Sequence, residues 1–182
     1  NFRWSITPEE LRQVNDLKLF EVFNGHPTVH NFGGGDVASL EQMWDVVLSA
    51  GREVYGIAVD DAHSFKEFRP DLSNPGRGWV SVQAAELSES AIVEALEAGR
   101  FYSSTGVEIE QVKSASDGLD VVIKQQRDFK YTTRYTGQGG KLLATSPELA
   151  SSYKFRPGET YVRATVTRSD NEVAWVQPVF AR

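Results

Sequence analysis

The chain has 182 residues, of which 40% are hydrophobic, and a formal net charge of −6. This length is enough for one or two hydrophobic cores, and the excess of acidic residues argues against binding to a nucleic-acid backbone. No apolar run approaches the length of a bilayer span, so we expect no membrane partner. The chain has no Cys, which excludes disulfides and thiolate metal ligands.

The N-terminal residues Asn1-Phe2-Arg3-Trp4 lack the pattern of a signal peptide, and the chain does not begin with Met. We therefore expect a soluble chain whose localisation the sequence does not define. Its first residue is compatible with a processed, cloned or partial end.

The first half of the chain predicts helices that alternate with strands. Thr7-Pro8-Glu9-Glu10 and Ser39-Leu40-Glu41-Gln42 are capping boxes, which start helices. Because strands separated by helices usually form parallel β/α units, we predict an α/β fold for residues 1–106. The other elements that the pattern predicts are strands at 17–23, 53–59, 78–84 and 101–104 and a helix at 88–98.

The second half changes to short β-rich runs separated by turn residues such as Ser116-Asp117-Gly118 and Pro157-Gly158. We predict a small antiparallel all-β sandwich domain over residues 107–182 from this pattern. The predicted strands cover residues 107–112, 119–124, 131–135, 141–144, 160–167 and 173–180.

The tetrapeptide Asp60-Asp61-Ala62-His63 follows the predicted strand 53–59 directly. In α/β folds, ligands and catalytic groups collect at the carboxyl ends of strands. Asp61 and His63 are separated by one residue, so in an extended segment they point to the same side and can offer an oxygen and a nitrogen to one metal ion. The alternative interpretation is a plain strand-end turn, in which Asp60 is a cap and His63 is solvated.

A second polar cluster follows the predicted strand 17–23. Glu21 lies within this strand, Asn24 and His26 come at its end, and His30 lies slightly further on. The three His residues of the chain all fall in residues 26–63, just after the two most apolar strands. This distribution suggests a site, and the alternative is that one or two of them are solvated loop residues.

Three further segments are candidates for ligand contact. Arg77 lies in the Gly-bounded turn 74–79, where a guanidinium could fork onto a phosphate or carboxylate, or have no ligand. Ser103 brings a hydroxyl to the strand 101–104, but no G-x-S-x-G elbow supports a serine nucleophile. The Gly-rich loop 31–36 lacks the lysine and spacing of a P-loop, so we interpret it as a lid or connector.

Three segments taken together, Phe20–Pro27, Met43-Trp44-Asp45 and Asp60–His63, resemble the PHP family (polymerase and histidinol phosphatase domains). The closest resemblance is to the branch of carbaryl hydrolase-like metal-dependent phosphoesterases. Segments 74–79 and 101–106 add to it, and the resemblance extends well over residues 1–106 and more loosely over 164–180.

The resemblance implies a distorted β/α barrel with its site at the strand C-termini and two or three divalent metals held by His, Asp and Glu. The early H-x-H motif of that family and the His and Glu ligands after it are absent from this chain. We therefore expect the C-terminal part of a PHP-type barrel at residues 1–106, followed by the β-sandwich at 107–182. A second chain that completes the barrel is a further expected partner, because an open half-barrel exposes apolar surface.

By position, the resemblance implies that Asp61 and His63 are metal ligands of the late D-x-H motif. Glu21 matches the Glu of an E-[VI]-x-N strand and is assigned as a further metal residue. His26 would complete the metal shell or act as a catalytic acid or base, with His30 as the competing choice.

The resemblance also implies which residues would bind the substrate. Arg77 would steady an anion during catalysis, and Asn24, Arg77 and Ser103 would bind substrate. These roles predict a metal-dependent hydrolase that uses metal-activated water on a small-molecule phosphoester or a related ester. The expected cofactors are divalent ions of zinc, manganese or iron. The alternatives are carbamate or amide hydrolysis on the same metals, and a non-catalytic fragment or binding module that lacks the N-terminal ligands.

Overall fold

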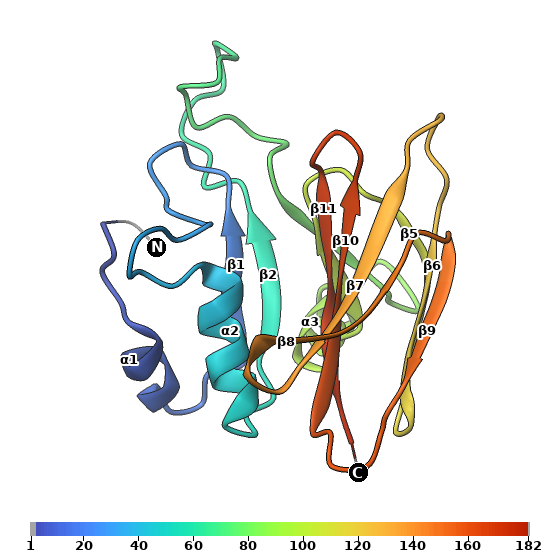
Figure 1. Cartoon of the computed structure of the whole chain (residues 1–182). Coiled ribbons are helices and arrows are strands. Elements are labelled where there is room, and N and C mark those ends of the chain that lie inside the picture. Colours follow the sequence, from blue (N-terminus) through green and yellow to red (C-terminus); the bar gives the residue numbers. More distant parts are fainter. Residues whose placement is uncertain (1–2, 182) are drawn as a thin grey trace.

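A computed structural model describes residues 3–181 of the chain (Figure 1). Asn1 and Phe2, on which the signal-peptide expectation partly rests, lie outside the described residues, as does Arg182. Within the described part of the chain, no helix has the length and apolar character that crossing a bilayer requires.

The described residues form three helices and eleven strands, which are arranged in three sheets. The helices are α1 (Pro8–Gln13), α2 (Leu40–Ser49) and α3 (Glu89–Glu97), and a short 3-10 turn, η1, covers Gln138–Gly140. The strands are β1 (Leu19–Asn24), β2 (Tyr55–Val59), β3 (Trp79–Val82), β4 (Phe101–Ser104), β5 (Ile109–Ala115), β6 (Gly118–Ile123), β7 (Tyr131–Gly137), β8 (Lys141–Ser146), β9 (Ala150–Lys154), β10 (Tyr161–Arg168) and β11 (Val173–Phe180).

Both predicted capping boxes are confirmed. The Thr7 hydroxyl accepts from the backbone N–H of Glu10, and the Glu10 carboxylate accepts from the backbone N–H of Thr7 at 2.8 Å. Ser39 and Gln42 make the same reciprocal pair at the start of α2. Each box satisfies two of the N–H groups that a helix start leaves without intrahelical partners, so the sequence fixes where these helices begin.

Strands β1 and β2 are parallel, and α2 connects them across one face of this two-stranded sheet (Figure 1). The core between helix and sheet includes Val22, Trp44 and Ala58. Gly56 is required here, because a Cβ at this position would lie 2.6 Å from Val22 Cγ1 and 2.9 Å from the Trp44 ring. The close approach of α2 to β2 therefore depends on the absence of a side chain at residue 56.

The other nine strands form a sandwich of two sheets. A six-stranded sheet has the order β3-β4-β11-β10-β7-β8, and a three-stranded sheet has the order β5-β6-β9. Their facing side chains form the largest apolar core, which includes Leu119, Val121, Tyr135, Val162 and Val176. The six predicted strands of the second half all occur near their expected positions, whereas β9, a polar segment with the sequence ASSYK, was not predicted.

The prediction of a partial β/α barrel is wrong, because the described chain is mostly β-structure. The only parallel pair among its strands is β1 with β2. Strands β3 and β4 pair antiparallel with each other, and β4 continues the sheet through β11. Strands from both sides of Gly106 thus belong to one sheet. The order of helices and strands does not fix strand direction, and α3 joins two antiparallel neighbours.

A buried ionic cluster fixes α2 onto the six-stranded sheet. The Arg163 guanidinium on β10 donates to both oxygens of Asp45, at 2.8 Å each, and to Glu41 at 2.9 Å. Tyr161 donates its hydroxyl to Asp45 at 3.0 Å, and Arg163 also lies over the Trp44 ring. Arg163 and Asp45 are 2% and 5% exposed, so this fork of two charge-assisted hydrogen bonds is shielded from water.

The pKa values follow from this burial. Burial by itself opposes the charge of Arg163, but the hydrogen bonds and charge of Asp45, together with the charge of Glu41, outweigh it and raise the pKa of Arg163. Burial, followed by the negative charge of Asp45, raises the pKa of the Tyr161 hydroxyl. Arg163 is therefore charged and Tyr161 neutral in the folded protein at ordinary pH.

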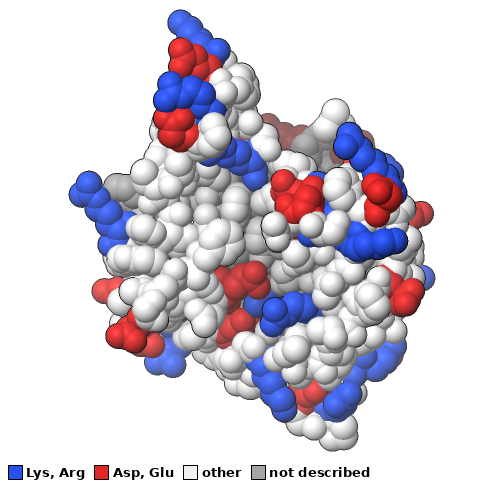
Figure 2. All heavy atoms as spheres, turned by 45° about the horizontal axis from the view of Figure 1, so that its top comes forward, with Lys and Arg blue, Asp and Glu red and all other residues white. Residues whose placement is uncertain are grey.

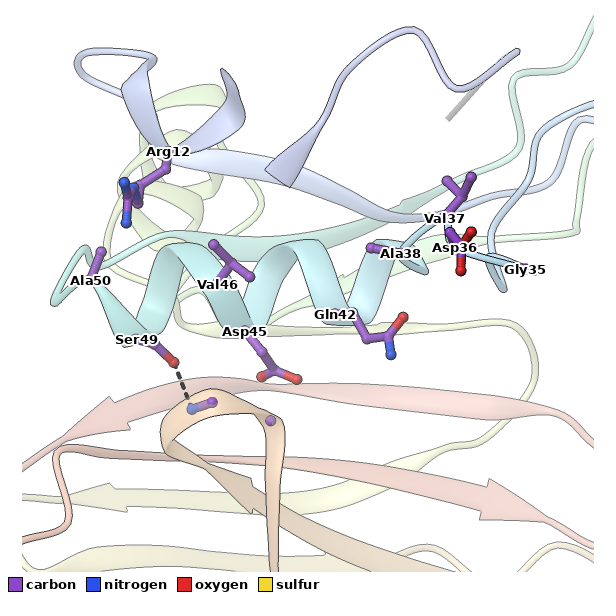
Figure 3. Close-up of a pocket in the computed structure, with 12 residues that line it drawn as sticks. Arg12, Gly35, Asp36, Val37, Ala38, Gln42, Asp45, Val46, Ser49 and Ala50 are labelled. Carbon is purple, nitrogen blue, oxygen red and sulfur yellow. Dashed lines mark hydrogen bonds between the residues drawn. The ribbon is translucent and has the colours of Figure 1, made fainter. Parts of the chain in front are cut away.

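Figure 3 shows Asp45 and Ser49 pointing from α2 toward the turn that connects β7 and β8. There the Ser49 hydroxyl accepts from the backbone N–H of Gly139 at 2.8 Å, and Gln138 donates to the Ser49 carbonyl. The cavity beside these residues, of about 690 Å³, contains none of the predicted site residues. Its walls come from α2, Arg12 of α1, residues 35–38 and the turn at Gly139 and Gly140.

We expect Asp45→Ala to lower the free energy of unfolding by about 3–5 kcal/mol, because it leaves the buried Arg163 charge without its main partner. Denaturant unfolding measures this loss. Lys124→Ala is the matched control, since it breaks the ion pair with Glu108 between two exposed side chains and should hardly change the midpoint. Equal stability of Asp45→Ala and the wild type would contradict the structural role of the cluster.

Candidate functional site

The parallel pairing of β1 and β2 brings the two polar clusters of the sequence together. Asn24 at the end of β1 is in register with Val59 at the end of β2, and the backbone N–H of Gly25 donates to the Val59 carbonyl at 2.8 Å. The segments 24–26 and 60–63 therefore leave the sheet at the same edge, as predicted for the ends of parallel strands.

Five of the predicted residues lie together there. The Asn24 side-chain amide donates to Glu21 Oε2 at 3.1 Å and to Asp61 Oδ2 at 3.3 Å. His63 Nε2 is 3.1 Å from Asp61 Oδ1. The ring of His26 stands edge-on to the ring of His63, with centroids 5.7 Å apart. These five residues, Glu21, Asn24, His26, Asp61 and His63, are called the strand-end cluster below.

Asp61 has a left-handed backbone conformation, with φ of 50°. For a residue other than Gly this conformation costs on the order of 1 kcal/mol, and it persists where surrounding contacts hold it. The Ser73 hydroxyl donates to the Asp61 carbonyl, and the backbone N–H of His63 donates to the Ser73 carbonyl at 2.9 Å. The loop thus holds the Asp61 carboxylate toward Asn24 and His63.

Asp60 is a cap, which was the alternative interpretation of this residue. Its carboxylate accepts from three consecutive backbone N–H groups, those of Gly76 at 3.0 Å, Arg77 at 2.6 Å and Gly78 at 2.8 Å. The contacts close the base of the loop between β2 and β3. Adjacent carboxylates in the sequence therefore differ in environment: Asp60 is bound to the backbone, and Asp61 faces the other side chains of the cluster.

The Arg77 guanidinium lies near the cluster, but it donates to backbone carbonyls. Its NH1 donates to Gly25 at 3.1 Å, and its NH2 donates to Arg69 and Pro70 at 2.9 and 3.2 Å. These bonds tie the segment after β1 to the loop between β2 and β3. Most of the donors that an incoming anion would use at Arg77 are therefore already engaged in the described structure.

The loop between β2 and β3 projects from the strand end of the molecule (Figure 1). The buried Asn74 side chain fixes it, because Asn74 accepts from Arg69 N and donates to the carbonyls of Ser64 and Glu67. Figure 2 shows basic and acidic side chains gathered at the projecting tip, where Arg69 pairs with Glu67 and Asp71.

Two predicted residues lie away from the cluster. Ser103 is fully buried on β4, where its hydroxyl donates to the Gly56 carbonyl at 2.8 Å and accepts from the Ala58 N–H. It attaches the edge of β2 to the sandwich instead of facing the strand-end cluster. His30, the alternative to His26, stacks on Trp4 with ring centroids 4.2 Å apart.

A cavity of about 710 Å³ opens beside the cluster, between the end of β1 and the β10–β11 hairpin. Asn24, His26 and Arg77 line it together with apolar side chains, mainly Phe23 and Trp175. Its volume falls in the range of small-molecule sites. Of the strand-end cluster, Asn24 and His26 line this space, whereas Glu21, Asp61 and His63 do not.

Sequence reasoning missed Asn31 and Trp175 as parts of this region. The Asn31 side chain accepts from the backbone N–H of Asn24 at 2.8 Å and donates to its carbonyl at 2.9 Å, like a neighbouring strand. The only sequence signal was a polar residue before the Gly-rich loop. Trp175 comes from a strand more than 100 residues away, so no local pattern could have placed it at this cavity.

Comparisons with protein-family models, with curated proteins and with solved structures found no match to this chain. The site is therefore interpreted from its own geometry.

We expect Asp60→Ala to loosen the loop between β2 and β3, because three backbone N–H groups lose their acceptor. Hydrogen exchange at Gly76, Arg77 and Gly78 should become at least tenfold faster, and trypsin should cut more readily at Lys66. Asp71→Ala, which removes an exposed partner of Arg69, is the control and should leave exchange at those three amides unchanged. Unchanged exchange in Asp60→Ala would mean that the cap does not hold the loop.

Proposed function

We propose that this chain is a metal-dependent hydrolase component in which Asp61 and His63 hold a divalent ion for the hydrolysis of a phosphoester or a related ester. The observation that carries the proposal is the convergence of Glu21, His26, Asp61 and His63 at the shared end of β1 and β2. Carboxylate and imidazole side chains at such an edge are the donor types that zinc, manganese and iron accept in hydrolases.

The spacing of Asp61 and His63 supports a shared ion. Two donors bound to one ion at about 2.0–2.2 Å stand about 2.8–3.6 Å apart in octahedral or tetrahedral geometry. The separation of Asp61 Oδ1 and His63 Nε2 is 3.1 Å. Both side chains are accessible, with 40% and 69% of their surfaces exposed. The separation therefore agrees with two positions of one coordination shell, in which an ion would replace the direct contact between the two side chains.

The remaining positions of such a shell need other donors. Between Arg3 and Ala181, no three His, Asp or Glu side chains are grouped closely enough to hold an ion by themselves. Glu21 is a further carboxylate linked to this pair, because the Asn24 amide donates to both Glu21 and Asp61. We propose that Glu21 and a donor from a second chain complete the shell.

A divalent ion at this position would supply Lewis-acid chemistry, in that it lowers the pKa of water and polarises a phosphoryl oxygen. The protein side chains would position the reactants and move the proton. His26 Nδ1 is contacted by the backbone N–H of Thr28, which can only donate, so the neutral ring carries its proton on Nε2. In this tautomer Nε2–H would orient a reactant by a hydrogen bond, and to protonate a leaving group His26 would first have to take up a second proton on Nδ1 in place of the Thr28 contact.

The cavity supports a small substrate. It is lined by the cluster residues Asn24 and His26 and by the apolar side chains of Phe23 and Trp175, so an apolar group of a phosphoester could lie in it while the ester group lies at its His26 edge. Arg77 would hold the walls of this space through its bonds to Gly25, Arg69 and Pro70. A carbamate or amide substrate on the same ion is the alternative reaction.

A non-catalytic binding module is the second candidate function. The described residues supply an incomplete set of ion ligands, which favours this candidate. The Arg77 guanidinium also favours it, because it donates to backbone carbonyls of the protein. In that case the cavity would bind its ligand without hydrolysis. The two candidates differ in whether the purified chain retains an ion and turns over an ester.

We expect purified wild-type protein to contain zinc, manganese or iron, and the double variant Asp61→Ala/His63→Ala to lose it, because both proposed ligands are removed. Elemental analysis with circular dichroism measures metal content and folding in the same samples. His30→Ala is the control, since His30 stacks on Trp4 outside the strand-end cluster, and it should retain the metal. About one ion per two chains would indicate a shell shared between chains. The absence of metal in folded wild-type protein, even after incubation with Zn²⁺ or Mn²⁺, would favour the binding module.

A further inference from the structure

Both polar atoms of the Asn24 side chain are hydrogen-bonded to other groups of the protein. Asn24 is 7% exposed, and its amide oxygen accepts from the backbone N–H of His26 at 2.9 Å. A backbone N–H can only donate, so this contact assigns the oxygen and nitrogen of the amide. The NH₂ group must therefore face Glu21 and Asp61, which accept from it at 3.1 and 3.3 Å.

The two donors of this NH₂ group serve two different carboxylates. Glu21 comes from within β1, whereas Asp61 follows β2, and each contributes one oxygen to the same nitrogen. Carboxylates this close repel each other unless a donor or cation lies between them. The amide supplies that donor with no charge of its own, and it leaves the other Asp61 oxygen directed at His63.

The backbone of Asn24 is fixed as firmly as its side chain. Asn31 bonds to both its N–H and its carbonyl, at 2.8 and 2.9 Å, and takes the place of a neighbouring strand at this point of β1. The next residue, Gly25, bonds to Val59 of β2. The amide therefore projects from a backbone that is held on both sides.

We propose that Asn24 is a positioning residue that sets the spacing of the Glu21 and Asp61 carboxylates before any ligand binds, and that it does not donate to substrate. Both of its N–H groups and its oxygen are already engaged with the protein, so a substrate could gain a bond from it only by breaking one of these contacts. The part of this inference that concerns ion binding rests on the proposed function. The preset spacing of the carboxylates does not, and it can be measured without metal.

The first experiment compares Mn²⁺ affinity by isothermal titration for wild type, Asn24→Ala and Gln177→Ala. Gln177 is the matched control, because it is also a buried amide and bonds to both backbone groups of Gly56 away from any carboxylate. Residues that orient metal ligands typically change affinity 10- to 100-fold. We expect Asn24→Ala to weaken Mn²⁺ binding at least tenfold, and Gln177→Ala to lower the unfolding midpoint without changing the affinity. Equal affinity of wild type and Asn24→Ala would overturn the inference and leave the metal site in place.

The second experiment is a double-mutant cycle of Asn24→Ala and Asp61→Ala in EDTA, read by urea unfolding. If Asn24 holds Asp61, the two substitutions should not act independently. The fold-decrease in the folding equilibrium constant of the double variant should then be about fivefold smaller than the product of the fold-decreases of the two single variants. Independent losses would overturn the positioning role. Should the wild type bind no Mn²⁺, the proposed hydrolase function fails, and this cycle alone decides the inference: coupling supports it and additivity contradicts it.

Discussion

The arrangement of the molecule depends on the buried fork between Arg163 and Asp45. This pair is the most buried of the ion pairs that join α2, which packs on the parallel β1–β2 unit, to β10 in the centre of the six-stranded sheet. The cavity next to the strand-end cluster has one wall from each of these bodies. The charges are costly to bury, and they are tolerated because Glu41, Thr165 and Tyr161 satisfy the remaining polar positions. The ionic contact thus helps to set the distance between β1 and the β10–β11 hairpin, together with the stacking of Phe23 on Trp175.

Side chains replace strand neighbours at both outer edges of the parallel pair. Gln177 and Ser103 bond to the backbone of Gly56 on the β2 side, and Asn31 bonds to the backbone of Asn24 on the β1 side. Parallel sheets are usually covered on both faces and extended by further strands. Here the amides and the hydroxyl satisfy backbone groups that a third and a fourth strand would otherwise pair, which explains how a two-stranded parallel sheet persists beside a β-sandwich.

Part of the candidate site could be read from the sequence. Asp61 and His63 follow a recognisable strand at a spacing of two, and they do contact each other. The roles of Arg77 and Asn24 could not be read in this way, because the same guanidinium or amide serves equally well for a ligand or for backbone and carboxylate groups. Which of these partners comes within reach depends on where the loops 60–78 and 24–31 meet, and that is set by contacts between residues far apart in the chain.

The sequence by itself determined the local elements: both capping boxes start helices where expected, and ten of the eleven strands in the described chain lie at or near predicted positions. Tertiary structure decided how those strands pair. A period-two pattern is the same for parallel and antiparallel neighbours, so β3 and β4 could not be assigned to the sandwich from their sequence. The alternation Val162-Arg163-Ala164-Thr165-Val166 is the pattern of a half-buried strand, but the face of β10 that carries Tyr161, Arg163 and Thr165 is buried against α2. Local hydrogen bonding and side-chain periodicity depend on neighbouring residues. Strand partners depend on residues up to about 70 positions apart, as in the pairing of β4 with β11, and the buried Asp45–Arg163 pair joins residues 118 positions apart.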